Sequence, residues 1–444
     1  MDIANLIPTF GSTLYTLGAF VIALSVIVAV HEYGHYIVGR WCGIKADVFS
    51  LGFGPVLWSR PDKHGTVWQI AALPFGGFVK FMGDADASST GVDGAIHEMD
   101  DETRRMTMHG APLWARSLTV AAGPVFNFVL SILVFGALAL YVGGIKEPVQ
   151  VSSPKALPAS YGVLQEGDVL LDVGGFTIET MGDVTKNHEA LEQVATIPYL
   201  VVRDGAEITV DGPFPLPPMV GSVSMRSAAE AAGLQVDDVI TAIDGERIYT
   251  FSQLQQIAIN SEGRELALTV WRDGEELDFN FRTKKGIVET DDGFEERWLI
   301  GMGGGIPFEP AVGPLGLGEA ASRGVTQTYG IISGTFGALK SMISGDIGRC
   351  GISGPVGIAR ASGATARMGL TNFIYFVAVI STAVGLLNLF PIPVLDGGHL
   401  VFHAYEAVSG RAPGDKALQI LMIIGLTLVL SLMVFGLTND FTCP

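Results

Sequence analysis

The residues best suited to chemistry are His-Glu-Tyr-Gly-His, which follow directly on a long uncharged run. His31 and His35 are four positions apart, so on a helix they lie one turn apart on the same face and can share one metal ion. Neutral imidazole suits zinc, and the adjacent Glu32 can reach a metal-bound water as a general base. The alternative is a helix end where these side chains only meet lipid headgroups. An ionisable cluster joined to a spanning helix is more often functional, so the spacing predicts a hydrolytic zinc centre.

A catalytic zinc ion needs a third protein ligand and an open position for water. We expect that ligand to be Asp396, in Asn-Leu-Phe-Pro-Ile-Pro-Val-Leu-Asp-Gly-Gly-His, the first charged residue after another long uncharged run. Gly397 and Gly398 would let backbone and solvent approach the metal. Taken alone, Asp396 is equally suited to a helix N-cap or turn. His399 and His403 lack an adjacent glutamate, and we interpret them as neighbours of the site or as interfacial residues.

Four uncharged runs are long enough to carry these residues through a membrane. They are 3–30, 117–145, 368–395 and 417–439. A helix needs about 20 apolar residues to cross the hydrocarbon core. Charged residues make up only 16% of the 444 residues and hydrophobic residues 48%, whereas a soluble domain carries about 25% charged residues. The composition therefore indicates a membrane protein.

Lysine and arginine near the ends of the runs indicate how the chain is oriented. They are more frequent in the loops 41–113 and 399–416 than beside the other span ends, which places both loops in the cytoplasm. The first and third spans then run in the same direction. Their C-terminal ends therefore emerge on the same side, where His31, His35 and Asp396 can converge.

The region 145–310 is a soluble, acidic insert between the second and third spans. It holds 12 of the 27 lysine and arginine residues but 28 of the 45 aspartate and glutamate residues, and so carries most of the net charge of −18. An acidic chain disfavours nucleic acid as a partner, because phosphate binding needs a basic surface. The insert contains an internal repeat, in which 161–178 resembles 232–248.

Each copy of the repeat has an acidic turn, a strand, a glycine turn, a helical stretch and further strands rich in β-branched residues. The strands are expected at 169–173 and 239–243, and the second copy has a helix at 251–259 and a strand at 266–271. This order resembles PDZ domains of the bacterial, circularly permuted type, and the second copy matches better than the first. PDZ domains bind peptides by adding a strand to a sheet edge.

The three motifs in order resemble the site-2 protease family of intramembrane metalloproteases. These are the His-Glu-Tyr-Gly-His sequence on the first span, Gly-Pro-Val-Phe-Asn at 123–127 on the second, and Asn-Leu-Phe-Pro-Ile-Pro-Val-Leu-Asp-Gly-Gly on a later one. Two PDZ-like copies between spans two and three narrow the resemblance to the bacterial regulator of sigma-E protease type. It implies Zn²⁺ held by His31, His35 and Asp396, with Glu32 as the catalytic proton acceptor.

The resemblance also implies the partners. The substrate would be a single-span membrane protein cut within the membrane plane, of the anti-sigma factor type, and remnant signal peptides would be another class. The PDZ-like copies would bind peptides or unfolded segments, and the spans would contact the lipid bilayer. The protein would lie in the bacterial inner membrane, with the PDZ-like copies in the periplasm and the active site near the cytoplasmic side.

The segment 66–84 is a candidate for holding the substrate. Its two apolar arms surround Pro-Phe-Gly-Gly, a hairpin pattern. From the sequence alone it is either a peripheral cytoplasmic hairpin or a membrane-associated one. The resemblance favours a reentrant β-loop whose edge, around Gly76 and Gly77, pairs with an unwound substrate.

Three residues before Asp396 are expected to bind the substrate from the other side. Pro391 and Pro393 break the third helix and free backbone groups near the metal. Asn388 could hydrogen-bond the substrate backbone.

The predicted fold class is an α-helical membrane protein of about four transmembrane helices with a membrane-associated β-hairpin, plus two extracytoplasmic PDZ-like α+β domains. The expected order is helix 1 (1–40), a loop with the hairpin (41–113), helix 2 (114–145), PDZ-like domains (146–217 and 218–310), a linker with interfacial helices (311–367), helix 3 (368–398), a loop (399–416) and helix 4 (417–439).

Two other functions compete with that of an intramembrane protease. A PDZ-bearing scaffold with a vestigial metal site is disfavoured by the intact Glu32. A transporter that relays protons through histidine and aspartate is disfavoured because the four spans show no inverted repeat.

Overall fold

The computed structural model describes residues 3–84, 99–224, 227–290, 293–345 and 353–442. The chain divides into two compact units. The first comprises 1–139, 317–337 and 352–443, and the second comprises 140–316 and 338–351, with residue 444.

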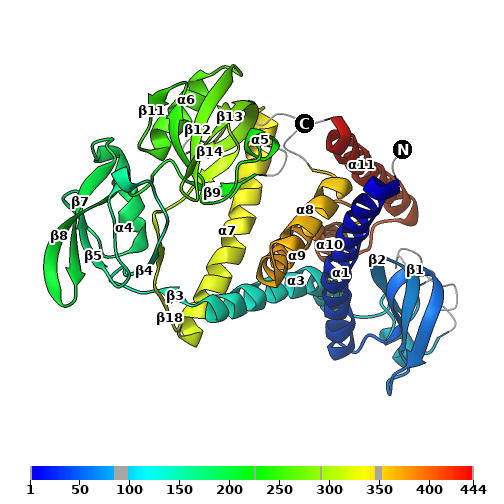
Figure 1. Cartoon of the computed structure of the whole chain (residues 1–444). Coiled ribbons are helices and arrows are strands. Elements are labelled where there is room, and N and C mark those ends of the chain that lie inside the picture. Colours follow the sequence, from blue (N-terminus) through cyan, green and yellow to red (C-terminus); the bar gives the residue numbers. More distant parts are fainter. Residues whose placement is uncertain (1–2, 85–98, 225–226, 291–292, 346–352, 443–444) are drawn as a thin grey trace. The chain divides into compact units, whose positions relative to one another are not determined.

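Four described helices are long and apolar enough to cross a membrane. They are α1 (Ile3–Trp41), α3 (Leu113–Val142), α9 (Leu370–Asn388) and α11 (Asp415–Thr442) (Figure 1). Each contains one of the four uncharged runs or most of it, so the number and order of the spans expected from the sequence are confirmed by length and composition.

Small and hydroxyl residues bring the spanning helices together. Gly34 of α1 lies so close to α3 that a Cβ there would be 2.5 Å from the carbonyl oxygen of Ala122. The hydroxyl of Ser131 on α3 donates to the carbonyl of Ala378 on α9 at 2.9 Å, and that of Ser381 on α9 donates to the carbonyl of Asn127 at 3.0 Å. Such contacts hold helices together where lipid offers no hydrophobic driving force.

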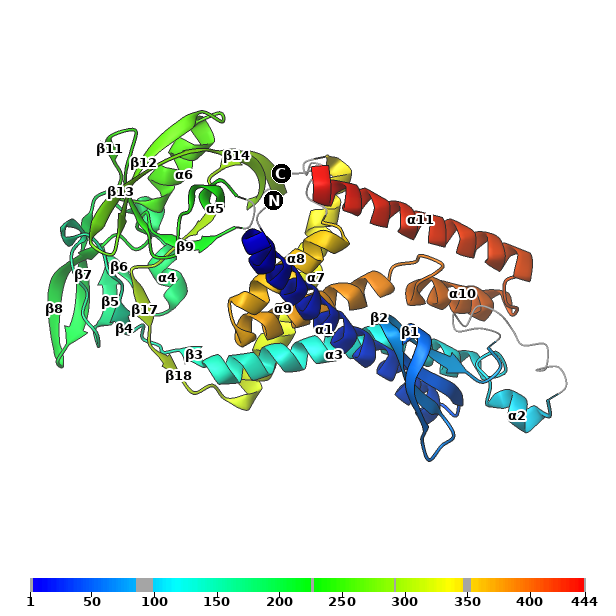
Figure 2. The same ribbon diagram turned by 45° about the vertical axis from the view of Figure 1, so that its right-hand side comes forward.

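The third spanning helix is shorter than expected. It ends at Asn388, and a separate helix α10 (Asp396–Ser409) follows (Figure 2). The predicted break at Pro391 and Pro393 is confirmed, because proline has no backbone N–H to continue the helical ladder. The predicted bounds are wrong, since the helix does not extend to 398 and residues 399–409 are helical instead of a loop. Asp396 lies in the first turn of α10 instead of at the end of the span.

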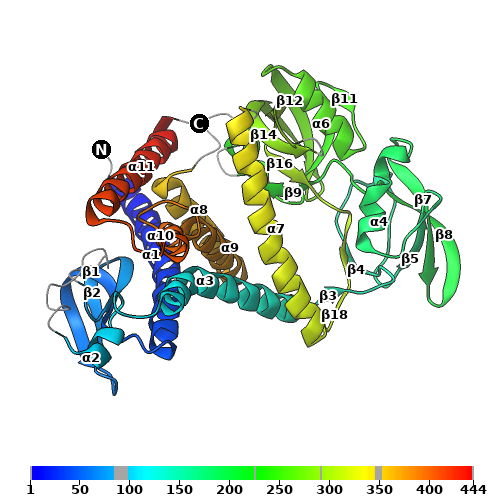
Figure 3. The same ribbon diagram turned by 180° about the vertical axis from the view of Figure 1, so that it is seen from behind.

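The segment after α1 forms a small sheet against that helix (Figure 3). Its strands are β1 (Ala46–Pro61) and β2 (Val67–Phe81). Leu51 of β1 pairs with Ile70 on one side and with Gly77 on the other. The two arms of the expected hairpin over 66–84 therefore do not pair with each other, and that prediction is corrected: the first half of β1 lies between them and supplies both with backbone partners.

The remaining helices of this part of the chain are short or amphipathic. They are α2 (Asp101–Arg105), α7 (Leu317–Ser344) and α8 (Pro355–Arg367). Helices α7 and α8 occupy most of the 311–367 stretch in which interfacial helices were expected. Within the first unit, Gly363 of α8 leaves no room for a Cβ against Thr16, and the Arg367 side chain donates to the hydroxyl of Thr16 at 3.2 Å, so α8 packs against α1.

The second unit contains two four-stranded sheets with the same strand order. One has the order β6-β5-β7-β8 and the other β11-β10-β12-β13. The strands are β5 (Val169–Val173), β6 (Phe176–Thr177), β7 (Thr196–Arg203), β8 (Ala206–Pro213), β10 (Val239–Ile243), β11 (Glu246–Arg247), β12 (Glu265–Arg272) and β13 (Glu275–Arg282). Their helices are α4 (Met181–Lys186), α5 (Ala228–Ala232) and α6 (Phe251–Asn260).

A buried ion pair recurs at the same place in both sheets. The guanidinium of Arg203 donates two hydrogen bonds of 2.7 Å to the carboxylate of Asp168. The guanidinium of Arg272 donates two, of 2.6 and 2.7 Å, to the carboxylate of Asp238. Both carboxylates are buried. The sequence repeat thus corresponds to repeated structure, including a polar feature that the pattern of apolar residues did not reveal.

Short strands complete the second unit. They are β3 (Gly144–Ile145), β4 (Val151–Pro154), β9 (Val220–Val223), β14 (Lys284–Thr290), β15 (Gly293–Leu299), β16 (Met302–Gly304), β17 (Phe308–Pro310) and β18 (Val312–Gly313). Strand β16 pairs with β9, whereas β17 pairs with β4 and β18 with β3. The second PDZ-like domain was predicted to end at 310, and this boundary is corrected. From Phe308 the chain pairs with β4, which belongs to the first copy.

Candidate metal centre

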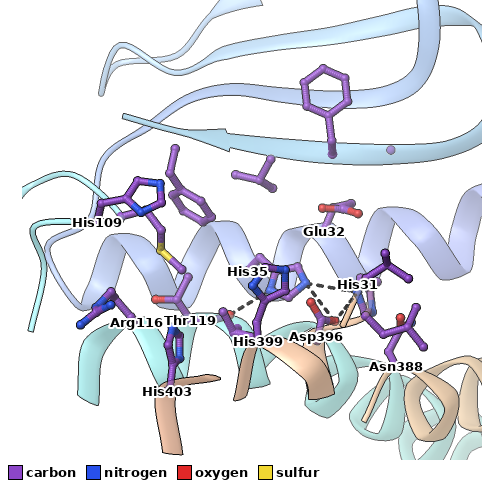
Figure 4. A pocket seen from close by; sticks show the side chains of 18 residues that line it. His31, Glu32, His35, His109, Arg116, Thr119, Asn388, Asp396, His399 and His403 are labelled. Atoms are coloured by element: carbon purple, nitrogen blue, oxygen red, sulfur yellow. Dashed lines mark hydrogen bonds and ion pairs between the residues drawn. The ribbon is translucent and has the colours of Figure 1, made fainter. Parts of the chain in front are cut away.

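Three potential metal ligands converge from α1 and α10 (Figure 4). The Nε2 atoms of His31 and His35 are 3.2 Å apart. Oδ2 of Asp396 lies 3.1 Å from Nε2 of His31 and 3.5 Å from Nε2 of His35. The structure therefore brings together the three ligands that the sequence predicted.

The spacing of these atoms fits zinc. Tetrahedral ligands about 2.0–2.1 Å from a zinc ion are separated from one another by about 3.3 Å, and the three distances of 3.1, 3.2 and 3.5 Å bracket that value. Oδ2 of Asp396 is also buried and makes no hydrogen bond, and its charged neighbours are the two imidazoles. A buried carboxylate is costly unless it is paired or binds a metal, so a cation shared with the two imidazoles would stabilise it.

Helix α3 sets the orientation of both imidazoles. Nδ1 of His35 lies 2.8 Å from the carbonyl oxygen of Thr119, so this nitrogen donates and Nε2 faces the other ligands. Nδ1 of His31 lies 3.2 Å from the side-chain amide of Asn127. Gly123 lies against both rings, and a Cβ there would be 2.6 Å from Cε1 of His35 and 2.8 Å from Cε1 of His31.

Glu32 lies on the side of α1 that faces the small sheet (Figure 4). A Cβ on Gly77 of β2 would be 3.3 Å from Cγ of Glu32. Both residues line a pocket of about 270 Å³ that also contains the three ligands. Glu32 is therefore beside the metal site but outside the ligand set, as a general base must be.

The electrostatics of α10 favour a bound cation. Burial alone raises the pKa of Asp396, but the imidazoles of His35 and His31 outweigh it and hold that pKa below its usual value. Asp396 is thus a carboxylate, the form that binds metal. Burial lowers the pKa of His403 to about 4, and the nearby Arg116 charge acts in the same direction, so His403 is neutral at pH 7.

His399 and His403 are neighbours of the site and not part of the ligand cluster. Both line the pocket together with Arg116. Nδ1 of His403 lies 3.2 Å from the hydroxyl of Ser117. Arg116 forms a two-pronged ion pair with Glu406, at 2.6 and 3.1 Å, which ties α10 to the start of α3.

Two of the five predicted substrate-binding residues line the pocket, and the other three do not. Asn388 and Gly77 line the pocket. Gly76, with φ +127°, is instead packed against Phe53. Pro393 contacts α11, where a Cβ on Gly425 would be 3.0 Å from its ring. Pro391 is exposed. Neither Pro391 nor Pro393 is among the described residues that line the pocket.

The roles of the second-span motif were not predicted from the sequence, where Gly-Pro-Val-Phe-Asn is only a point of resemblance. In the structure, Gly123 leaves room for the two imidazoles and Asn127 contacts one of them. The available signal was an amide side chain four residues after a glycine, on one face of an apolar helix. The contribution of Thr119 gives no such signal, since a backbone carbonyl can belong to any residue.

Comparison with known proteins agrees with this geometry. Residues 19–432 match peptidase family M50. A protein of Agrobacterium fabrum that bears the provisional name zinc metalloprotease is 35% identical over 434 residues, covering 95% of this chain and 94% of its own. A protein of Rhizobium meliloti with the same provisional name is 36% identical, covering 96% of each chain. The regulator of sigma E protease of Haemophilus influenzae is 31% identical, covering 97% of this chain and 99% of its own.

The match covers the spans, the three candidate ligands and Glu32, and it extends over the acidic insert as well. The scaffold with a vestigial site and the proton-relay transporter are therefore set aside, and zinc is the metal that the family implies. The chain belongs to peptidase family M50, the site-2 protease family, and is a membrane-associated zinc metalloprotease.

Proposed function

We propose that this protein is an endopeptidase that cuts single-span membrane proteins within their transmembrane segments. The observation that carries the proposal is the position of the site. His31, Glu32 and His35 lie on an apolar helix long enough to cross a membrane, and the third ligand follows another such helix by eight residues. A hydrolytic centre placed there meets peptide bonds of segments that are themselves in the membrane.

The chemistry divides between the metal and the chain. His31, His35 and Asp396 would hold the zinc ion, which would supply a Lewis acid for the scissile carbonyl and for water. Glu32 accepts the proton of the attacking water and passes it to the leaving amine. The carbonyl of Thr119 and the amide of Asn127 hold the two imidazoles in place. The pocket is polar at its centre, which admits the water that hydrolysis consumes.

A transmembrane helix must be extended before it is cut, because its peptide bonds are enclosed in the helical ladder. Residues 77–81 of β2 pair with β1 on one side, and among the described residues they have no strand on the other. This edge lines the pocket beside Glu32. We infer that it pairs with the unwound substrate by strand addition, as part of a sheet that enters the membrane interface.

Asn388 faces the same pocket from the end of α9. Its amide now donates to the carbonyl of Val384 at 3.1 Å, a bond within its own helix. An extended substrate offers backbone carbonyls that can replace this partner. Asn388 would then bind the substrate opposite the β2 edge, whereas Pro391 and Pro393 act by breaking the helix.

The second unit is proposed to be a pair of PDZ-like domains that bind peptides or unfolded segments. Each has a four-stranded sheet and a capped helix. We place them in the periplasm of a bacterium and the active site near the cytoplasmic side of the inner membrane, from the distribution of lysine and arginine. Anti-sigma factors with one span are the first substrate class to test and remnant signal peptides the second.

The test compares three forms of the purified full chain in lipid vesicles: wild type, Glu32→Gln and Glu102→Gln. Glu102 is an exposed residue of α2, so Glu102→Gln controls for the same chemical change elsewhere. The substrate is a single-span protein whose products are located by mass spectrometry, beside a soluble peptide of the same span sequence made polar at its ends.

We expect cleavage within the span by wild type and Glu102→Gln, and its loss by at least a hundredfold in Glu32→Gln at unchanged zinc content, because glutamine keeps the shape but cannot accept a proton. Cleavage of the soluble peptide alone, or only outside the span, would refute the intramembrane proposal. Turnover by Glu32→Gln near that of wild type would refute the role of Glu32.

A further inference from the structure

The outer edge of β2 is closed at its C-terminal end by the side chain of Asp84. The backbone N–H of Phe81 donates to Oδ2 of Asp84 at 3.0 Å. The backbone N–H of Asp84 in turn donates to the carbonyl oxygen of Phe81 at 3.1 Å. Both hydrogen-bonding groups of the Phe81 backbone are therefore bonded to one residue, three positions further along the chain.

The backbone groups of Phe81 face away from β1. The next N–H along the chain, that of Met82, donates to the carbonyl oxygen of Lys45 at 2.8 Å, immediately before β1. Phe81 itself lies opposite Ala46 of β1. In an antiparallel pair, facing residues that do not bond to each other direct their own backbone groups outward. Oδ2 of Asp84 therefore lies where the carbonyl oxygen of an added strand would lie.

The same alternation determines which other residues of β2 face the outer edge. Residues 77–81 all have partners in β1, and the extra residue at the irregularity in this pairing belongs to β1. The alternation along β2 is therefore unbroken, and Gly77 and Val79 direct their backbone groups outward as Phe81 does. The N–H of Val79 accordingly faces the carboxylate of Glu32. With Phe81 closed, this stretch of the edge offers a substrate only Gly77 and Val79.

Asp84 and Phe81 are both held in place by their surroundings. The side chain of Asp84 is fully buried, and its Oδ1 lies 3.4 Å from Nε2 of His109. The ring of Phe81 packs against α1, where a Cβ on Gly39 would be 2.8 Å from Cε1 of that ring. A carboxylate also binds a backbone N–H more strongly than a neutral carbonyl does. A substrate carbonyl therefore does not readily displace Asp84 from Phe81.

We propose that Asp84 is a positioning residue that ends the substrate-pairing edge, so that an extended substrate pairs with Gly77 and Val79 and not with Phe81. The inference rests on the proposed pairing of the substrate with β2. A Cβ on Gly77 would be 3.3 Å from Cγ of Glu32, so the open part of the edge is the part beside the general base. A short edge limits how many backbone groups of a transmembrane helix must leave their helical partners, which is costly in lipid.

The first experiment uses the wild-type full chain in lipid vesicles and a synthetic single-span substrate. One peptide bond at a time is replaced by an ester, which lacks the N–H, and the scissile bond is left unchanged. We expect kcat/KM to fall about two- to tenfold, the effect of one hydrogen bond, at two positions that are two residues apart. At other positions an ester only loosens the substrate helix and should not lower kcat/KM.

The second experiment repeats the ester series with variants of the full chain. Asp84→Ala frees the N–H of Phe81 and clears the place of an added strand, so we expect a third sensitive position, two residues beyond one of the first two. Asp84→Asn keeps an acceptor oxygen and should return the pattern of two positions. Asp101→Ala, at an exposed carboxylate of α2, is the matched control and should give the wild-type pattern.

The pattern of sensitive positions separates the proposed role from a merely structural one. If Asp84 only stabilises the fold, Asp84→Ala should lower cleavage of every substrate alike and add no position, and that result would overturn the proposal. A third sensitive position in the wild type would also overturn it, whether or not any variant folds. Sensitivity at no position would refute the pairing with β2, and this inference with it. Failure of intramembrane cleavage is distinct, because it would already be seen with the unmodified substrate.

Discussion

Gly123→Ala should damage the metal site although it adds only one methyl group. The new Cβ would be 2.6 Å from Cε1 of His35 and 2.8 Å from Cε1 of His31. Carbon atoms in contact prefer about 3.5–4.0 Å. Both rings, or α3 itself, must therefore move by roughly 0.7–0.9 Å, more than the roughly 0.5 Å within which a functional site must be held.

The expected loss follows from this displacement. A misplacement of about 1 Å at a reacting group lowers the rate about a hundredfold, and here two of three ligands are displaced together. We expect kcat/KM to fall by at least about a hundredfold and zinc affinity to fall with it. Alanine favours a helix over glycine by about 1 kcal/mol, so a general loss of helical stability does not predict this result.

The assay compares Gly123→Ala with Gly18→Ala in the same membrane preparation, measuring bound zinc and cleavage. Gly18 lies on α1, and a Cβ there has open space around it. Gly18→Ala should behave as wild type in both measurements. Zinc affinity and cleavage within threefold of wild type in Gly123→Ala would refute the argument, because the rings would then have room that the structure does not show.

Two further perturbations test the ligand set and the second unit. Asp396→Ala should lose most of its bound zinc as well as its activity, since it removes one of three protein ligands; full zinc content with reduced activity would show that Asp396 is not a ligand. Asp238→Asn leaves the guanidinium of Arg272 without its carboxylate and should lower the stability of that sheet by about 3 kcal/mol, seen as faster hydrogen exchange in 239–243; unchanged exchange would show that the pair contributes little.

The convergence of the three candidate ligands could be predicted, because its signals are the local spacing of residues and the direction of the spans. A four-residue spacing puts His31 and His35 on one helix face. The first and third spans run in the same direction, which brings Asp396 to the same side of the membrane as the two histidines. The strands at 169–173 and 239–243 were placed correctly for a similar reason. The alternation of apolar and polar residues in a strand, and the glycine turn that ends it, can both be read within a few neighbouring residues.

The features that the sequence did not predict depend on long-range pairing. The two arms of 66–84 have the pattern of strands that pair with each other, but the strand that contains Leu51 lies between them. No residue in either arm indicates this third strand. The third span was assigned to 368–398 from its uncharged run although Pro391 and Pro393 were expected to break the helix, which ends at Asn388. Asn127 was not predicted to contact His31, because its contact depends on how α1 and α3 are packed.

The parts of the site that hold zinc and those proposed to hold substrate belong to different kinds of structure. The ligands depend on close helix contacts that glycine permits, at Gly34, Gly123 and Gly385. The wall beside Glu32 is formed by residues 77–81 of β2, whose outer edge has no strand among the described residues and is proposed to pair with the substrate. Backbone pairing depends on an extended backbone more than on side-chain identity. Under this proposal, a segment is selected by whether it can be unwound at the strand, while the chemistry beside it stays the same.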